Sequence, residues 1–252
     1  MPRLFAFSFT VFAALAAAPV ASAADDDVKT IITQAIKAHG GEEFLSKHKA
    51  ARSQNKGKIT LPGVGEAEFT QDLAYMLPDK LKDSLELNIG GQKITIATLL
   101  NGDKLSIEAA GKPIPITDEI KSAMKDGQHM MSVARLTPLL KDKSYELSLF
   151  GEAKVEDKPT IGIRVSQKGK KDLTLFFDKK THLLAKIEHR TQVPGAGQEV
   201  NEERIILEYK KDKNGISLPK KVLVKHDGKT FLEADSVETE YLESIDESEF
   251  KK

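Results

Sequence analysis

Six histidines are the side chains of this sequence best suited to hold a metal ion: His39, His48, His129, His182, His189 and His226. A metal-binding pair on one helix needs a spacing of three or four residues, so that both rings share a face. A glycine pair interrupts any helix between His39 and His48. His182 and His189 lie an odd number of residues apart, which directs their side chains to opposite faces of a strand. We therefore predict no metal site and interpret His39 as a histidine at a helix end.

The sequence lacks the motifs that position a catalytic nucleophile or a bound phosphate. It has no G-x-S-x-G elbow, no P-loop, and no S-x-x-K followed by the other motifs of penicilloyl enzymes. Gly195-Ala196-Gly197 lacks the third glycine of a dinucleotide-binding turn. Asp178 lies in an expected turn, where an aspartate caps its own backbone. We therefore expect neither an enzyme nor a bound cofactor.

Methionines and paired lysines are the remaining side chains that suggest binding. Met124, Met130 and Met131 either line an adaptable apolar site or pack in a core, and the core is the simpler interpretation. The lysine pairs mostly follow expected strand ends, where they protect sheet edges from association or, alternatively, contact membrane phosphates weakly. These pairs are Lys170-Lys171, Lys179-Lys180, Lys210-Lys211 and Lys220-Lys221.

The first 23 residues have the pattern of a secretory signal peptide. Arg3 provides a positive charge, Leu4 to Ala18 is apolar and uncharged, and Ala21-Ser22-Ala23 is a small-residue cleavage site. The apolar run is too short to be a membrane anchor, and no other stretch approaches the roughly 20 apolar residues of a spanning helix. We therefore expect an exported protein, periplasmic or secreted, whose mature chain begins near Ala24 and has no transmembrane segment.

Charge and cysteine content narrow the class of protein. The chain has 38 basic and 38 acidic residues, and the leader holds Arg3 and no acid, so residues 24–252 carry 37 basic and 38 acidic residues and a net charge of −1. This balance argues against binding to nucleic acid. Cysteine is absent, which excludes disulfides and thiol chemistry. Residues 24–252 contain no linker or repeat, and we expect them to form a single domain.

Two helical segments are expected before and within a series of strands. The first begins at Asp25-Asp26-Asp27, carries an apolar stripe from Val28 to Ile36, and stops at Gly40-Gly41. Thr117 is the expected N-cap of the second, and a further short helix is expected around Leu136 to Leu140. The expected inward stripe of the second helix consists of Ile120, Met124, Met131 and Ala134.

From Lys58 onwards, apolar and charged residues alternate with a period of two, which is typical of strands with one wet face. Tight turns are expected at Gly90-Gly91, Asn101-Gly102, Asn214-Gly215 and Asp227-Gly228. The sequence thus predicts an α+β fold with one strongly curled antiparallel sheet of about 10–12 strands. This sheet forms an open half-barrel, and the N-terminal and mid-chain helices cover its concave face.

The alternation also predicts which side chains line the concave face. Glu66, Glu68 and Lys82 mark the solvent-exposed face of their strands. The apolar residues that alternate with them share the opposite face, which is the concave one. Such a sheet is too wide for two short helices to fill, which leaves an apolar cavity. The predicted cavity residues are Phe69, Leu73, Tyr75, Leu85, Leu87, Ile96, Leu105, Ile107, Met124 and Met131.

Several segments carry a resemblance to a known family: Ala38-His39-Gly40-Gly41 with Phe44-Leu45, Leu136 to Leu140, Leu173 to Lys186, Gly215 to Pro219 with Asp227-Gly228, and Ile245 to Phe250. They resemble the periplasmic lipoprotein-carrier superfamily, the Lol-type outer-membrane lipoprotein-sorting proteins, in a divergent branch of uncharacterised secreted bacterial proteins. The resemblance implies an open curled sheet plugged by helices, with a cavity that binds acyl chains. Such carriers have an arginine in the cavity on an early strand. Residues 66–75 and 80–89 contain none, so no functional residue is carried over.

Two functions fit these expectations. The first is an exported, non-catalytic carrier that holds a lipid, an acylated protein or another apolar ligand in the concave cavity. The second is a structural or interaction protein of the cell envelope, with an envelope protein as its partner and a cavity filled by its own side chains. The two hypotheses differ in whether the cavity is empty or packed.

Overall fold

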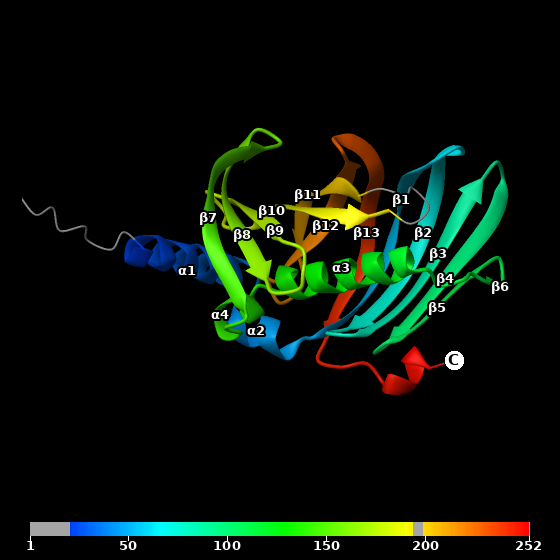
Figure 1. The fold of residues 1–252 in the computed structure, drawn as a ribbon, viewed down its shortest axis with the longest axis horizontal. Helices are drawn as coiled ribbons and strands as arrows, with labels where there is room; N and C mark the ends of the chain where they lie inside the picture. The colour runs from blue at the N-terminus through cyan, green and yellow to red at the C-terminus, as the bar shows by residue number, and fades with distance from the viewer. Residues whose placement is uncertain (1–20, 194–198, 252) are drawn as a thin grey trace, which may run out of the picture.

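The structure is a computed structural model that describes residues 21–193 and 199–251 (Figure 1). Residues 1–20 of the expected leader lie outside the described residues, as does the expected Pro194-Gly195-Ala196-Gly197 loop. The described chain forms one sheet, four α-helices and a C-terminal 3-10 helix.

The thirteen strands described form one antiparallel sheet that stays open, as predicted. Two meanders meet where the first strand pairs with the last, so the sixth and seventh strands are the two edges. The count exceeds the expected range by one, because a strand of only two residues, Lys112–Pro113, pairs at one edge. The strands are β1 (Ala50–Leu61), β2 (Gly65–Met76), β3 (Lys80–Ile89), β4 (Gln92–Asn101), β5 (Lys104–Ala109), β6 (Lys112–Pro113), β7 (Tyr145–Val155), β8 (Lys158–Gln167), β9 (Leu173–Asp178), β10 (Leu184–Gln192), β11 (Glu199–Lys211), β12 (Ser217–His226) and β13 (Lys229–Leu242).

The helices lie before the sheet, between its two meanders and after it. They are α1 (Ala21–Ala38), α2 (Glu42–Lys47), α3 (Asp118–Ala134), α4 (Thr137–Lys141) and the 3-10 helix η1 (Glu247–Phe250). The described part of α1 includes the expected acidic start at Asp25 and the four residues before it. Thr117 caps α3 as expected, because its hydroxyl oxygen accepts the N–H of Ile120 at 3.3 Å. None of the helices in the described ranges is both long and apolar enough to cross a bilayer.

The two faces of the sheet differ in what packs on them. Ile163, Leu175 and Ile187 pair in one row across β8, β9 and β10, and they share a core cluster with residues of α1, α3 and α4. We call this the inner face. Phe176 and Lys186 pair in the neighbouring row and belong to the opposite, outer face. Figure 1 shows α3 crossing the hollow of the sheet on the inner side.

One large core joins the helices to the inner face of β7–β10. Ile32, Val133, Leu136 and Leu175 are completely buried in it. Burial of each such side chain stabilises the fold by about 1.5–3 kcal/mol relative to an exposed one. A second inner-face cluster, around Phe69 on β1–β4 and β13, contains strand residues and no helix residues. The helical core therefore covers one half of the inner face.

Gly57, in the middle of β1, is a position where the sheet tolerates no side chain. β1 runs so close to β13 that a Cβ at Gly57 would overlap the carbonyl oxygen of Glu233. We expect Gly57→Ala to lower the free energy of unfolding by about 1–3 kcal/mol, because the backbone has to shift.

Urea unfolding measures this change, and Gly127→Ala on α3 is the matched control. Nothing lies within 4 Å of a Cβ at Gly127, and alanine is favoured over glycine in a helix by about 1 kcal/mol, so this variant should be at least as stable as wild type. Wild-type stability in Gly57→Ala would contradict the close approach of β1 to β13.

Candidate functional site

A cavity of about 290 Å³ lies between α3 and the inner face of the sheet. We call it the inner cavity, and its volume is close to the lower limit of about 300 Å³ for ligand sites. Its apolar lining consists of Leu45, Met130, Met131, Ala134, Leu184, Ile187, Ile206, Pro219 and Val222. Its polar lining consists of His39, Tyr75, Arg135, Arg204, Tyr209, Ser217 and Tyr241.

Arg135, at the C-terminal end of α3, brings a buried positive charge to the inner cavity. Its guanidinium donates to the carbonyl oxygens of Leu45, at 3.0 Å, and of His48, and thereby ties α3 to α2. The guanidinium also lies 5.0 Å from the ring centre of Tyr241. Burial raises the pKa of Tyr241 and of Tyr75, and Arg135 only partly opposes this, so both hydroxyls stay protonated at pH 7. One end of the cavity is therefore cationic and rich in hydrogen-bond donors.

Arg135 is not among the site residues that the sequence pattern predicted. Strands β2 and β3, where the resembling carriers would place theirs, contain no arginine. Arg135 reaches the cavity from a helix. Arg204, the second arginine of the lining, reaches it from β11 and forms an ion pair with Glu202 at 3.0 Å. One feature of the sequence could have indicated Arg135. It directly precedes the Leu136 to Leu140 segment, which is one of the segments that carry the family resemblance.

His39 and Tyr209 fix the start of β10 against the end of α1. Nδ1 of His39 lies 2.8 Å from the carbonyl oxygen of Ala35, so this nitrogen carries the proton. Nε2 then accepts the N–H of Leu184 at 3.4 Å, and the Tyr209 hydroxyl donates to the carbonyl oxygen of Leu184 at 2.7 Å. Burial lowers the pKa of His39, which keeps the ring neutral at pH 7. His39 thus serves as a hydrogen-bonded residue at the end of α1.

The strand register places the eight strand residues of the predicted cavity on one face. Phe69 pairs with Leu87 and Leu85 with Ile96, while Leu73, Tyr75, Leu105 and Ile107 follow in the same phase. Of these eight residues, Tyr75 lines the inner cavity. Phe69 and Leu87 are buried in the cluster on β1–β4, where they are 4 % and 3 % exposed. The other five are half-buried. Their contact with a ligand stays a prediction.

The inward face of α3 includes part of the expected stripe together with the residues next to it. The buried residues of α3 are His129, Met130 and Val133, whereas the expected Met124, Met131 and Ala134 are half-buried. Met131 and Ala134 line the inner cavity, and Met124 lies outside its lining. Met131 and Ala134 also pack against the main core, and Met130 beside them lines the cavity as well.

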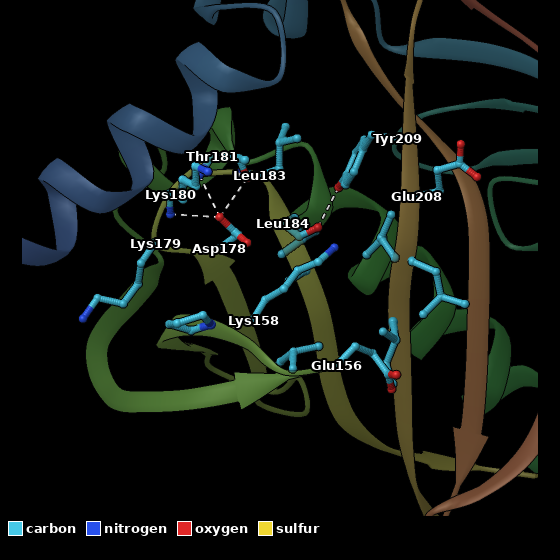
Figure 2. A pocket seen from close by; sticks show the side chains of 16 residues that line it. Glu156, Lys158, Asp178, Lys179, Lys180, Thr181, Leu183, Leu184, Glu208 and Tyr209 are labelled. Carbon is cyan, nitrogen blue, oxygen red and sulfur yellow. Dashed lines mark hydrogen bonds between the residues drawn. The ribbon is translucent and has the colours of Figure 1, made fainter.

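A second and larger pocket, of about 730 Å³, opens on the outer face (Figure 2). We call it the outer pocket. It lies between the β7–β8 hairpin, the turn before β10, and β11, and its apolar floor includes Val155, Ala185, Ile205 and Leu207. The inner cavity is the stronger candidate for the main site, because a helix covers it and a buried charge marks one end.

Asp83 places a carboxylate on the otherwise apolar inner face of β3. It pairs with Leu73 on β2, and its Oδ1 is buried without a hydrogen-bond partner among the described residues. Burial raises the pKa of Asp83 to about 6, and a hydrogen bond from Gln71 only partly opposes this. Ionised Asp83 therefore destabilises the folded chain near neutral pH.

The free energy of unfolding should consequently depend on pH. The folded pKa of Asp83 lies above its ordinary value of 3.8, so the folded state binds more protons between these values and loses stability as pH rises from about 4 to about 6. We expect Asp83→Asn to raise the free energy of unfolding at pH 8 by about 1–2 kcal/mol, a value reduced for partial solvent screening, and to leave it near wild type at pH 4.

Chemical denaturation at the two pH values measures the difference. Glu68→Gln, on the wet face of β2, is the control and should behave as wild type at both values. A gain for Asp83→Asn of the same size at pH 4 and pH 8 would show that the carboxylate does not titrate in this range.

Solved structures give the chain a fold family. No protein-family model matches the chain, and no curated protein matches it. The chain is similar to a LolA superfamily protein from Nitrosomonas europaea (10 % identity, TM-score 0.55) and to a DUF1329 family protein from Desulfovibrio piger (14 % identity, TM-score 0.52). Each similarity covers 89 % of this chain and 97 % of the other. At these identities the similarity establishes a fold and not an activity. The chain has the LolA-like fold that its sequence segments predicted.

Proposed function

We propose that this protein is an exported, non-catalytic binding protein that holds a lipid, an acyl chain or another apolar ligand between α3 and the inner face of the sheet. The observation that carries this proposal is the inner cavity, whose lining is mostly apolar and whose one end holds Arg135. Ligand sites of this kind combine a hydrophobic wall with a few polar groups that fix orientation.

Half-buried side chains beyond the cavity give an apolar chain further surface to cover. Leu73, Leu85 and Leu105 lie on the same face as Tyr75, which lines the cavity, and each retains some exposure. Burial of apolar surface is favourable by about 25 cal/mol per Å². A chain that starts in the cavity and continues along this face would gain binding energy over its whole length.

The expected site of action is the periplasm or the extracellular space. The leader pattern before Ala24 supports export. The LolA-like fold supports an envelope role, since a fold neighbour is described as a LolA superfamily protein. The ligand under this proposal is a lipid or the acyl group of a protein.

A structural role is the second candidate, and one observation favours it. The cluster around Phe69 and Leu87 packs strand residues against each other on the inner face, which leaves that part filled. In this case an envelope protein would be the partner and the remaining cavity would hold no lipid. Organic extraction of the natively purified protein, followed by mass spectrometry, separates the two: a stoichiometric lipid supports the carrier, and its absence supports the structural role.

Filling the cavity should weaken binding without adding charge. Ala134 lines the inner cavity, so Ala134→Phe places a ring where the ligand would lie. We expect the affinity for a dansyl-labelled fatty acid, measured by fluorescence titration, to fall about tenfold or more, which is about 1.4 kcal/mol or more.

Ala97→Phe makes the same substitution on the exposed outer face of β4 and should bind the probe as wild type does. Circular dichroism checks that both variants fold. If folded Ala134→Phe binds with unchanged affinity, the inner cavity is not the binding site.

A further inference from the structure

The sheet is incomplete between β10 and β11. The pairing of these strands reaches no further than Lys186 and Ile205 in this direction. β10 nevertheless begins at Leu184, and β11 continues to Lys211 with irregular pairing to β12 near Glu208. We call the unpaired stretch between Leu184 and the end of β11 the seam.

Side chains take the place of the strand ladder at the seam. The N–H of Leu184 is bound by His39, and the carbonyl oxygen of Leu184 is bound by the Tyr209 hydroxyl. Figure 2 shows Tyr209 reaching from β11 to Leu184. Buried backbone groups require such partners. Rotation of one tyrosine would therefore open the seam without breaking any hydrogen bond between the two strand backbones.

The inner cavity and the outer pocket meet at this seam. Leu184, Ile206 and Tyr209 line both of them, one on each side of the sheet. The floor of the outer pocket is apolar next to the seam, where Ala185 and Ile205 belong to an outer-face cluster. An apolar chain that passed the seam would thus contact apolar surface on both sides.

The rim of the outer pocket has an excess of one positive charge after its ion pairs are taken into account. Lys179, Glu156 and Glu208 each form an ion pair with a residue outside the pocket lining. Lys158 and Lys180, by contrast, form no ion pair within residues 21–193 and 199–251, and Figure 2 shows Lys158 extending across the pocket.

Asp178 is the carboxylate of the rim that forms no ion pair. Its Oδ1 accepts the N–H of Lys180 at 2.9 Å and that of Thr181 at 2.7 Å. These hydrogen bonds direct this oxygen to the turn. Burial would raise the pKa of Asp178, but the turn N–H groups and the nearby Lys158 lower it. Asp178 therefore offsets one of the two ammonium groups, and the rim keeps an excess of one positive charge.

We propose that the seam is a passage between the inner cavity and the outer pocket, that Tyr209 closes it, and that the ligand is a single acyl chain with an anionic head group. The chain lies under α3, and the head group lies in the outer pocket beside Lys158 and Lys180. This inference rests on the proposed carrier function, because it assigns the ligand of the same cavity. A carboxylate and a phosphate share the charge that the ammonium groups recognise.

Tyr209 variants test the passage. Stopped-flow fluorescence measures the entry and exit of a dansyl-labelled fatty acid. We expect Tyr209→Ala to raise both rate constants about tenfold or more and to change the affinity less, because a gate lowers the barrier in both directions. Tyr209→Phe loses only the hydroxyl that holds Leu184 and should give a smaller rise in both rates.

Tyr209→Phe also keeps the test valid if the alanine variant fails to fold. Tyr145→Phe, on β7 and outside both linings, is the matched control and should have wild-type rates. Wild-type entry and exit rates in the folded Tyr209 variants would overturn the passage.

Charge reversal tests the head-group site. Calorimetric titration compares dodecanoate, dodecyl phosphate and uncharged dodecanol in a Lys158→Glu and Lys180→Glu double variant. We expect the affinity for the anion, carboxylate or phosphate, to fall about tenfold while the affinity for dodecanol stays unchanged. A loss for one anion alone identifies the head group as that one.

The control makes the same charge change at the far edge of the sheet, as Lys104→Glu and Lys112→Glu, and should bind all three probes as wild type does. Equal losses for dodecanol and the anions, or no loss at all, would overturn the head-group site. If wild type binds all three probes and the Lys158→Glu and Lys180→Glu double variant binds them equally well, the carrier function stands and this inference fails. If wild type binds none, the carrier function itself fails.

Discussion

An open sheet of thirteen strands presents an apolar face that other parts of the chain have to keep from water. Helices α1, α3 and α4 meet this requirement over β7–β10, where Ile163 and Leu175 are completely buried. Over β1–β4 the strand residues pack on each other around Phe69. Between these two regions α3 crosses the hollow, and the inner cavity lies beneath it. The cavity is thus a consequence of a sheet that is wider than its helical cover.

Core packing of Met130 and Val133, together with a few polar contacts, sets the position of α3. Arg135 holds its C-terminal end to α2 through two backbone carbonyl oxygens. Asp126 forms an ion pair with Lys171 at 2.9 Å, and Gln128 donates to the carbonyl oxygen of Pro78 at 3.3 Å. The buried residues of α3 all lie in its C-terminal half, so its N-terminal half has the weaker attachment to the core.

Local sequence patterns were sufficient to predict the strands and their faces. Features that depend on contacts between distant parts of the chain could not be predicted. The charged residues around Glu68 fixed the phase of Phe69, and Asn101-Gly102 marked the turn from β4 to β5. The pairing of β1 with β13 joins the two ends of the chain and has no local signal. Bulges in β11 shift its period, which concealed the role of Tyr209. Arg135, one of the two arginines that line the cavity, lies at a helix end, where its contacts depend on α2.

A crystal structure of the exported protein with a fatty acid brominated at the end of its chain would test the account most directly. Anomalous scattering locates the bromine without reference to the shape of the ligand. We predict a bromine peak under α3, bordered by Met131 and Ile206. A peak elsewhere on the protein, or a cavity filled by side chains of the protein itself, would contradict it.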